Sequence, residues 1–127
     1  MKCSDFTILI GEDNPSELKI YNKVLSLEGY QLILVESGAK ILNELKDKKV
    51  DLLLTDLNMK PMSGLAVVMA VNEKYPVLPV IVVSGYYKGM VDNFNQKTVR
   101  VAAFIQKPVG IKVLKQKIRE VLKIGVS

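Results

Sequence analysis

Three acidic side chains follow apolar runs of the chain, and their type indicates metal-assisted chemistry. Glu12 and Asp13 come after FTILI (6–10), and Asp56 comes after the leucines of VDLLLT (50–55). Carboxylates that converge on one pocket repel one another, and a divalent cation such as Mg²⁺ relieves this repulsion with oxygen ligands. Asp13 and Asp56 are therefore predicted as direct ligands, with a backbone carbonyl after Asp56 as a third and Glu12 acting through a bound water.

A hydroxyl and an ammonium group follow two later apolar runs. Ser84 ends VLPVIVVS (77–84), and Lys107 follows VAAFI (101–105). The lysine can pair with a carboxylate before a reaction and with a phosphoryl group after it, while the hydroxyl can donate to a phosphoryl oxygen. Phosphoryl transfer needs groups of this kind to neutralise the phosphoryl oxygens. Asp56 is then the predicted nucleophile, which would form an aspartyl phosphate.

Five short apolar runs must position these side chains. The four named above are joined by QLILV (31–35), and their continuous hydrophobicity predicts strands covered on both faces, as in a parallel sheet.

Helix-like segments lie between the runs. Asn14, Pro15 and Glu17 form a capping-box-like start to the first, which ends at Gly29. The others are a helix capped by Ser37, one from Gly64 to about Tyr75, a weak signal at 87–97, and a last helix at about 111–123 with Ile111, Leu114, Ile118, Val121 and Leu122 on one side. Strands that alternate with helices predict one α/β domain, (βα)5, spanning residues 1–127, with a doubly wound five-stranded parallel sheet.

The strand ends supply the argument for a single site. Taken alone, Asp13 before Asn14-Pro15 or Lys107 before Pro108 fits an ordinary turn, and the Lys107-Pro108 bond could be cis. Four of the five runs nevertheless end in a carboxylate, a hydroxyl or an ammonium group. Because open α/β sheets bind ligands at the carboxyl ends of their strands, we expect these groups to form one functional site.

The amino-acid composition excludes several kinds of functional site. The 127 residues include no histidine and one cysteine, Cys3. This excludes the usual zinc sites, Ser-His-Asp and Cys-His nucleophile pairs, an internal disulfide, and a histidine phosphoryl donor on this chain. No apolar run approaches the roughly 20 residues of a membrane span, so a cytoplasmic protein is expected. The formal charge is +5, and six basic residues against Glu120 in 107–123 predict a solvated helix face that favours an acidic partner rather than nucleic acid.

From Ile8 to Leu122 the chain resembles the receiver domains of bacterial two-component response regulators, the CheY-like superfamily. The matching residues are Glu12, Asp13, Asp56 within DLNMKPMSG, Ser84, Phe104 and Lys107 before Pro108. The resemblance implies the flavodoxin-like strand order 2-1-3-4-5, Asp56 as phosphoacceptor, the Asn58 backbone carbonyl as a Mg²⁺ ligand, and Ser84 and Phe104 as switch residues. The chain departs from the family pattern at Glu12, where aspartate is commoner, at Lys60-Pro61 in the loop after Asp56, and at Gly85, where alanine is frequent.

The resemblance also implies partners. A sensor histidine kinase or a histidine phosphotransfer protein would supply the phosphoryl group. A downstream protein would bind the surface formed by the fourth helix, fifth strand and fifth helix. We expect no enzymatic activity beyond self-phosphorylation and self-dephosphorylation. We also expect no direct contact with nucleic acid or membrane. The protein is expected to be a monomer or a phosphorylation-dependent dimer.

Three alternatives remain open at this point. The chain could be an interaction-only receiver that is never phosphorylated, or a fragment of a larger regulator or hybrid kinase. It could also be a small hydrolase with an aspartate nucleophile, although Asp56-Leu57-Asn58 lacks the second acid of such phosphatases.

Overall fold

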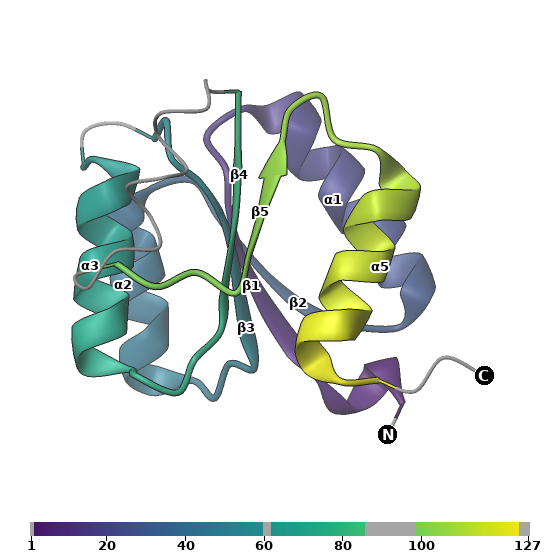
Figure 1. Ribbon diagram of the computed structural model, residues 1–127, viewed down its shortest axis with the longest axis horizontal. Coiled ribbons are helices and arrows are strands. Elements are labelled where there is room, and N and C mark those ends of the chain that lie inside the picture. The colour runs from purple at the N-terminus through teal and green to yellow at the C-terminus, as the bar shows by residue number, and fades with distance from the viewer. Residues whose placement is uncertain (1, 60–61, 86–98, 125–127) are drawn as a thin grey trace.

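The computed structural model describes residues 2–59, 62–85 and 99–124, in which strands and helices alternate (Figure 1). The strands are β1 (Thr7–Gly11), β2 (Gln31–Val35), β3 (Leu52–Asp56), β4 (Val80–Ser84) and β5 (Ala103–Gln106). The helices are the short η1 (Cys3–Asp5), α1 (Pro15–Glu28), α2 (Gly38–Asp47), α3 (Gly64–Lys74) and α5 (Ile111–Leu122). The weak helix signal at 87–97 lies outside the described residues.

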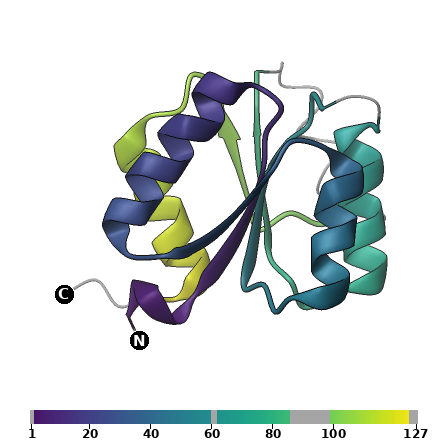
Figure 2. The same ribbon diagram turned by 180° about the vertical axis from the view of Figure 1, so that it is seen from behind.

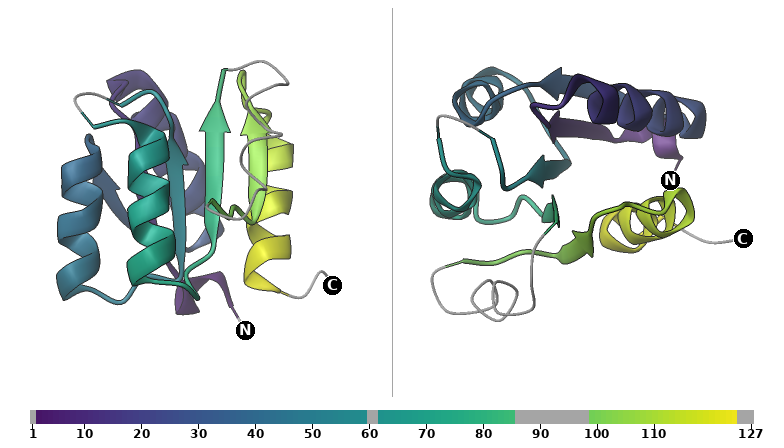
Figure 3. Two further views of the ribbon diagram at one scale, coloured as in Figure 1. Left: turned by 60° about the vertical axis from the view of Figure 1, so that its left-hand side comes forward. Right: turned by 90° about the horizontal axis from the view of Figure 1, so that it is seen from above.

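The five strands form one parallel sheet in the order β2-β1-β3-β4-β5. Helices α1 and α5 cover one face of the sheet, and α2 and α3 cover the other (Figures 1 and 2). All of the strand pairs are parallel, and the left-hand view of Figure 3 shows the arrowheads at one end, so the carboxyl ends of the strands lie at one edge of the sheet. The predicted doubly wound α/β fold and its strand order are confirmed.

Two hydrophobic cores explain why the strands read as continuous apolar runs. Successive side chains of a strand point to opposite faces, so Ile8 and Ile10 pack on the α1 and α5 side while Leu9 packs on the α2 and α3 side. In β3 the same alternation places Leu52 and Leu54 in one core and Leu53 in the other. Every residue of β3 and β4 is buried, because helices cover both faces there.

The helices begin and end at capping residues close to the positions that the sequence predicts. The Asn14 side chain accepts hydrogen bonds from the amides of Ser16 and Glu17, at 3.0 and 3.1 Å, and Pro15 is the first helical residue of α1. Gly29 ends this helix with a φ of 103°, a conformation that glycine adopts without strain. The Ser37 hydroxyl caps α2 through the Lys40 amide, as expected.

Several boundaries differ from the predictions. Strand β4 begins at Val80 rather than at 77, because Pro79 has no N–H for the ladder and Val77 is 93% exposed. Strand β5 begins at Ala103 rather than at 101. On α5, Leu114 and Ile118 are buried as predicted, but Ile111 is 49% exposed in the first turn.

A side-chain clamp ties α3 to the segment that leads into β5. The Arg100 amide donates to Asn72 Oδ1 at 2.6 Å, and Asn72 Nδ2 donates to the Arg100 carbonyl at 3.1 Å. These bonds fix the chain just before β5, the strand that carries Phe104 and leads to Lys107. None of the helices in the described part of the chain is long and apolar enough to cross a bilayer.

Candidate functional site

The predicted site residues meet at the carboxyl edge of the sheet. Glu12 follows β1, Asp56 is the last residue of β3, Ser84 is the last residue of β4, and Lys107 follows β5. Their register is consistent with one rim, because Asp56 pairs with Val83 in β4 and Ser84 pairs with Gln106 in β5. The structure therefore brings together groups that lie up to 95 residues apart in the chain.

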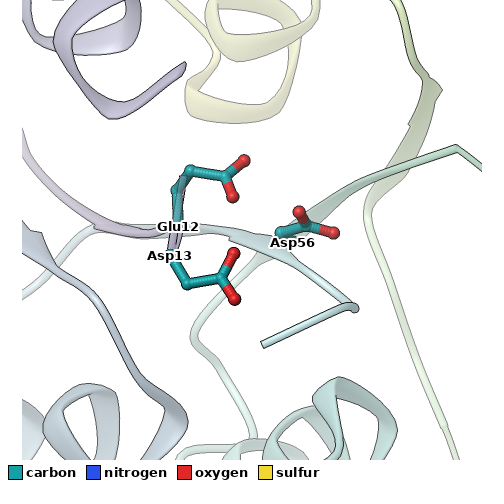
Figure 4. Close-up of side chains that lie close together, drawn as sticks. All are labelled: Glu12, Asp13 and Asp56. Carbon is teal, nitrogen blue, oxygen red and sulfur yellow. The ribbon is translucent and has the colours of Figure 1, made fainter. Parts of the chain in front are cut away.

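The three carboxylates converge closely enough to share a cation. One oxygen from each of Glu12, Asp13 and Asp56 lies within 4.8 Å of the others. Figure 4 shows the carboxyl groups of Glu12 and Asp13 directed toward that of Asp56. Glu12 and Asp56 are buried and Asp13 is exposed, which leaves the cluster an open side toward solvent. A set of hard oxygen donors of this kind fits Mg²⁺.

Lys107 bridges the acidic groups. Its Nζ donates to Asp56 Oδ2 at 2.7 Å and to Glu12 Oε1 at 3.0 Å. Burial of the ammonium group acts to lower the pKa of Lys107, but its hydrogen bonds to carboxylates outweigh that effect and raise the pKa above its ordinary value. The Lys107-Pro108 peptide bond is cis, and the Lys107 amide donates to the Ser84 carbonyl at 2.9 Å.

Glu17 is a fourth carboxylate that the sequence interpretation did not place in the site. Its Oε2 accepts a hydrogen bond from Lys107 Nζ at 2.6 Å. The predicted capping-box role for Glu17 is wrong, because the Asn14 amide donates to Glu12 Oε2 at 3.2 Å instead. A signal was available, since the first turn of the helix after β1 starts at the same rim as Glu12.

The two glutamates differ in their affinity for protons. Burial raises the pKa of Glu12 to about 8, and its hydrogen bond to Glu17 and the charge of Asp56 add to this effect, while Lys107 opposes it. The pKa of Glu17 is lowered, chiefly by the hydrogen bond that it accepts from Glu12, with a further contribution from Lys107. Burial thus favours the protonated form of Glu12, while its neighbours favour the ionised form of Glu17.

The loop after Asp56 orients that carboxylate. The Asn58 amide donates to Asp56 Oδ1 at 3.0 Å, so each oxygen of Asp56 has a donor. The role of the Asn58 backbone carbonyl as a metal ligand stays a prediction. The Lys60-Pro61 departure from the family pattern lies outside the described residues.

The two predicted switch residues lie on adjacent strands. Ser84 is 1% exposed, and its Oγ has no hydrogen-bond partner within the described part of the chain. A buried hydroxyl without a hydrogen-bond partner is costly. Phe104 is half-buried and packs against the core on the α2 and α3 side. Its change of rotamer stays a prediction.

Comparison with curated proteins finds relatives that are much longer than this chain. The transcriptional regulatory protein GlrR of Escherichia coli is 33% identical over 117 residues, which cover 91% of this chain and 26% of that protein. A cyclic di-GMP phosphodiesterase of Thermotoga maritima is 34% identical over 119 residues, which cover 92% of this chain and 31% of that protein. The chain thus spans about a quarter to a third of the length of these relatives.

Solved structures with the same fold include a CheY-like response regulator receiver domain protein from Methanospirillum hungatei. It is 26% identical, has a TM-score of 0.86, and the match covers 93% of this chain and 94% of that one. The response regulator protein TrrA from Thermotoga maritima, solved in complex with Mg(2+)-BeF, shares the fold at 22% identity, with a TM-score of 0.81 and coverage of 91% and 98%. A sequence profile described as "Response regulator receiver domain" matches residues 8–119, and the chain therefore belongs to this family.

Proposed function

We propose that this chain is a phosphoacceptor of a two-component system and that Asp56 receives the phosphoryl group. The donor would be a phosphohistidine of a sensor histidine kinase or of a histidine phosphotransfer protein in the cytoplasm. One observation carries the proposal: one oxygen from each of Glu12, Asp13 and Asp56 lies within 4.8 Å of the others, with Lys107 Nζ 2.7 Å from Asp56 Oδ2. This arrangement combines a nucleophile, a cation-binding set and a fixed positive charge.

The transfer forms one bond and breaks one bond. An Asp56 oxygen attacks phosphorus, the bond from phosphorus to the imidazole nitrogen breaks, and its electron pair stays on the imidazole. The Asn58 amide and Lys107 hold the Asp56 carboxylate in place for this attack.

Four groups would hold the metal ion. Asp13, Asp56 and the Asn58 backbone carbonyl would bind Mg²⁺ directly, and Glu12 would bind it through water. The ion would supply positive charge to the phosphoryl oxygens.

The phosphorylated form would differ in the position of Ser84 and Phe104. The buried Ser84 hydroxyl would donate to a phosphoryl oxygen, and Phe104 would turn into the space that Ser84 leaves. The surface formed by the fourth helix, β5 and α5 would then favour binding of a downstream protein, as a shift between two states. The expected fourth helix falls in 86–98, outside the described residues. Such a protein turns over no substrate beyond its own phosphorylation and dephosphorylation.

Intact-mass measurement after incubation with acetyl phosphate tests the proposal. The wild type is expected to gain one phosphoryl group when Mg²⁺ is present and none when the metal is chelated. Asp56→Asn is expected to gain none, whereas Asp47→Asn, which changes an exposed acid at the end of α2, is expected to behave like the wild type. Absence of any gain in the wild type would contradict the proposal and favour an interaction-only receiver.

A further inference from the structure

The Lys107 ammonium group is shared by three carboxylates, and Glu17 makes the shortest of the three contacts. The distances from Nζ are 2.6 Å to Glu17, 2.7 Å to Asp56 and 3.0 Å to Glu12. An ammonium group has three N–H donors, so these three acceptors use all of them. The Lys107 side chain is only 20% exposed, which limits its access to further partners.

Glu17 differs from the other two carboxylates in its position. Glu12 and Asp56 belong to the sheet edge, and both are in the acidic cluster that fits a cation. Glu17 belongs to the first turn of α1, its side chain is 35% exposed, and it is not part of that cluster. A cation bound by Asp13 and Asp56 would therefore leave the contact between Glu17 and Lys107 in place.

We propose that Glu17 is a positioning residue that retains the Lys107 ammonium group beside α1 and so opposes its engagement with a phosphoryl group on Asp56. The inference rests on the proposed function, since it concerns the charge that a phosphoryl group meets at Asp56. For Lys107 to donate to a phosphoryl oxygen, it must first break its hydrogen bond to one of the three carboxylates. The carboxylate that competes most closely is Glu17.

The negative charge of Glu17 also acts against a phosphoryl group on Asp56. A phosphoryl group brings between one and two negative charges to the rim at neutral pH. The Glu17 carboxylate, 2.6 Å from Nζ, reduces the positive field that Lys107 offers to this charge. Glutamine has nearly the same size and retains a carbonyl acceptor, but without the charge its hold on an ammonium group is weaker. Glu17→Gln is therefore expected to favour the phosphorylated form rather than to disrupt it.

The test measures binding of beryllofluoride, an anion that mimics a phosphoryl group, at saturating Mg²⁺ by fluorine NMR. Glu17→Gln is expected to lower the dissociation constant by about fivefold, the size of effect that a partly exposed ion pair produces. Glu36→Gln removes one exposed negative charge that follows β2 at the same edge and is not among the partners of Lys107, so it serves as the matched control. Its dissociation constant is expected to stay at the wild-type value.

A second comparison tests whether Glu17 acts through Lys107. In a Lys107→Met background, Glu17→Gln is expected to lose its effect on beryllofluoride binding, because the residue that it positions is gone. Glu17→Asp, which retains the charge on a shorter arm, is expected to tighten binding as well. Thermal melts of each variant confirm that it is folded.

The outcomes separate the two proposals. If the wild type binds no beryllofluoride with Mg²⁺, the proposed function is wrong and this inference falls with it. If the wild type binds but Glu17→Gln binds equally well or more weakly, the inference alone is overturned. It is also overturned if Glu36→Gln tightens binding as much as Glu17→Gln, or if the effect survives in the Lys107→Met background.

Discussion

Glu12 shows how one side chain can link proton binding to metal binding. The carboxyl group is 1% exposed and accepts hydrogen bonds from Lys107 and from the Asn14 amide. Burial raises its pKa from an ordinary value of 4.5 to about 8, so the folded, metal-free protein binds this proton more tightly than the unfolded chain does. A cation at the acidic cluster favours the ionised form. Protons and Mg²⁺ therefore compete at this residue.

We predict that the stability of the metal-free protein falls as the pH rises from about 5 to 8. Between the unfolded pKa of 4.5 and the folded pKa of about 8, the folded state holds more protons, so its stability is greatest at the acidic end of this window. The slope can reach at most about 1.4 kcal/mol per pH unit for one group. Urea unfolding in the presence of a chelator measures the free energy of unfolding at each pH.

The control for this slope is the substitution Glu12→Gln, which should flatten the curve over the same window, whereas Glu36→Gln should leave it unchanged. Glu17 does not contribute to the slope between about pH 5 and 8. Its lowered pKa stabilises the fold above its ordinary value of 4.5 and is lost only at more acidic pH. A slope that persists in Glu12→Gln would assign the pH dependence to another group.

At the scale of elements, the junction between β3 and α3 determines how Asp56 is presented. The Gly64 amide donates to the Leu57 carbonyl at 3.1 Å, so α3 begins against the backbone of the loop that follows Asp56. A Cβ atom at Gly64 would lie 2.3 Å from Leu57 Cα and 2.5 Å from its carbonyl oxygen. Backbone atoms cannot yield as a flexible side chain does, and this close approach explains why glycine occupies the position.

We predict that Gly64→Ala destabilises the protein by about 1–3 kcal/mol and weakens phosphorylation of Asp56, because the loop must shift to admit the methyl group. Gly85→Ala is the matched control, since within the described part of the chain the nearest atom to its added Cβ would be Lys107 Cβ at an ordinary 3.8 Å. Its stability should stay within about 0.5 kcal/mol of the wild type. Equal unfolding midpoints for the two variants would show that the Gly64 contact is unimportant.

Over the whole molecule, charge is distributed unevenly. The chain carries a formal charge of +5, yet Glu12, Asp13 and Asp56 gather on one edge of the sheet. Lys107 offsets part of the repulsion among them. A ligand that binds only the folded state stabilises the fold, and a cation at this edge also removes the remaining repulsion.

We predict that Mg²⁺ at about tenfold above its dissociation constant stabilises the protein by ~1.4 kcal/mol, which raises the melting temperature by about 5 °C. Asp13→Asn should reduce this shift, and sodium chloride at equal ionic strength should not reproduce it in the wild type. Calorimetry or circular dichroism measures the shift. A rise of equal size in Asp13→Asn would place the metal elsewhere.

The sequence by itself determined which residues follow the strands and so lie at the carboxyl edge of the sheet. Apolar runs, caps and turn residues are local signals, and parallel strands carry Glu12, Asp13, Asp56, Ser84 and Lys107 to the same side once their order is known. Family resemblance added the strand order 2-1-3-4-5, which composition and periodicity alone do not contain. The fold and the place of these five residues at the sheet edge could therefore be predicted without coordinates, whereas Glu17 was missed.

Only the tertiary structure decided how these groups pair. The contact between Glu17 and Lys107 joins residues 90 positions apart, and it depends on how α1 packs and rotates against the sheet rather than on any local pattern. The raised pKa of Glu12 likewise comes from burial and from neighbours on other elements. Pairing distances and desolvation arise from packing between segments that are distant in the chain, and the periodicity of a single segment carries no information about them.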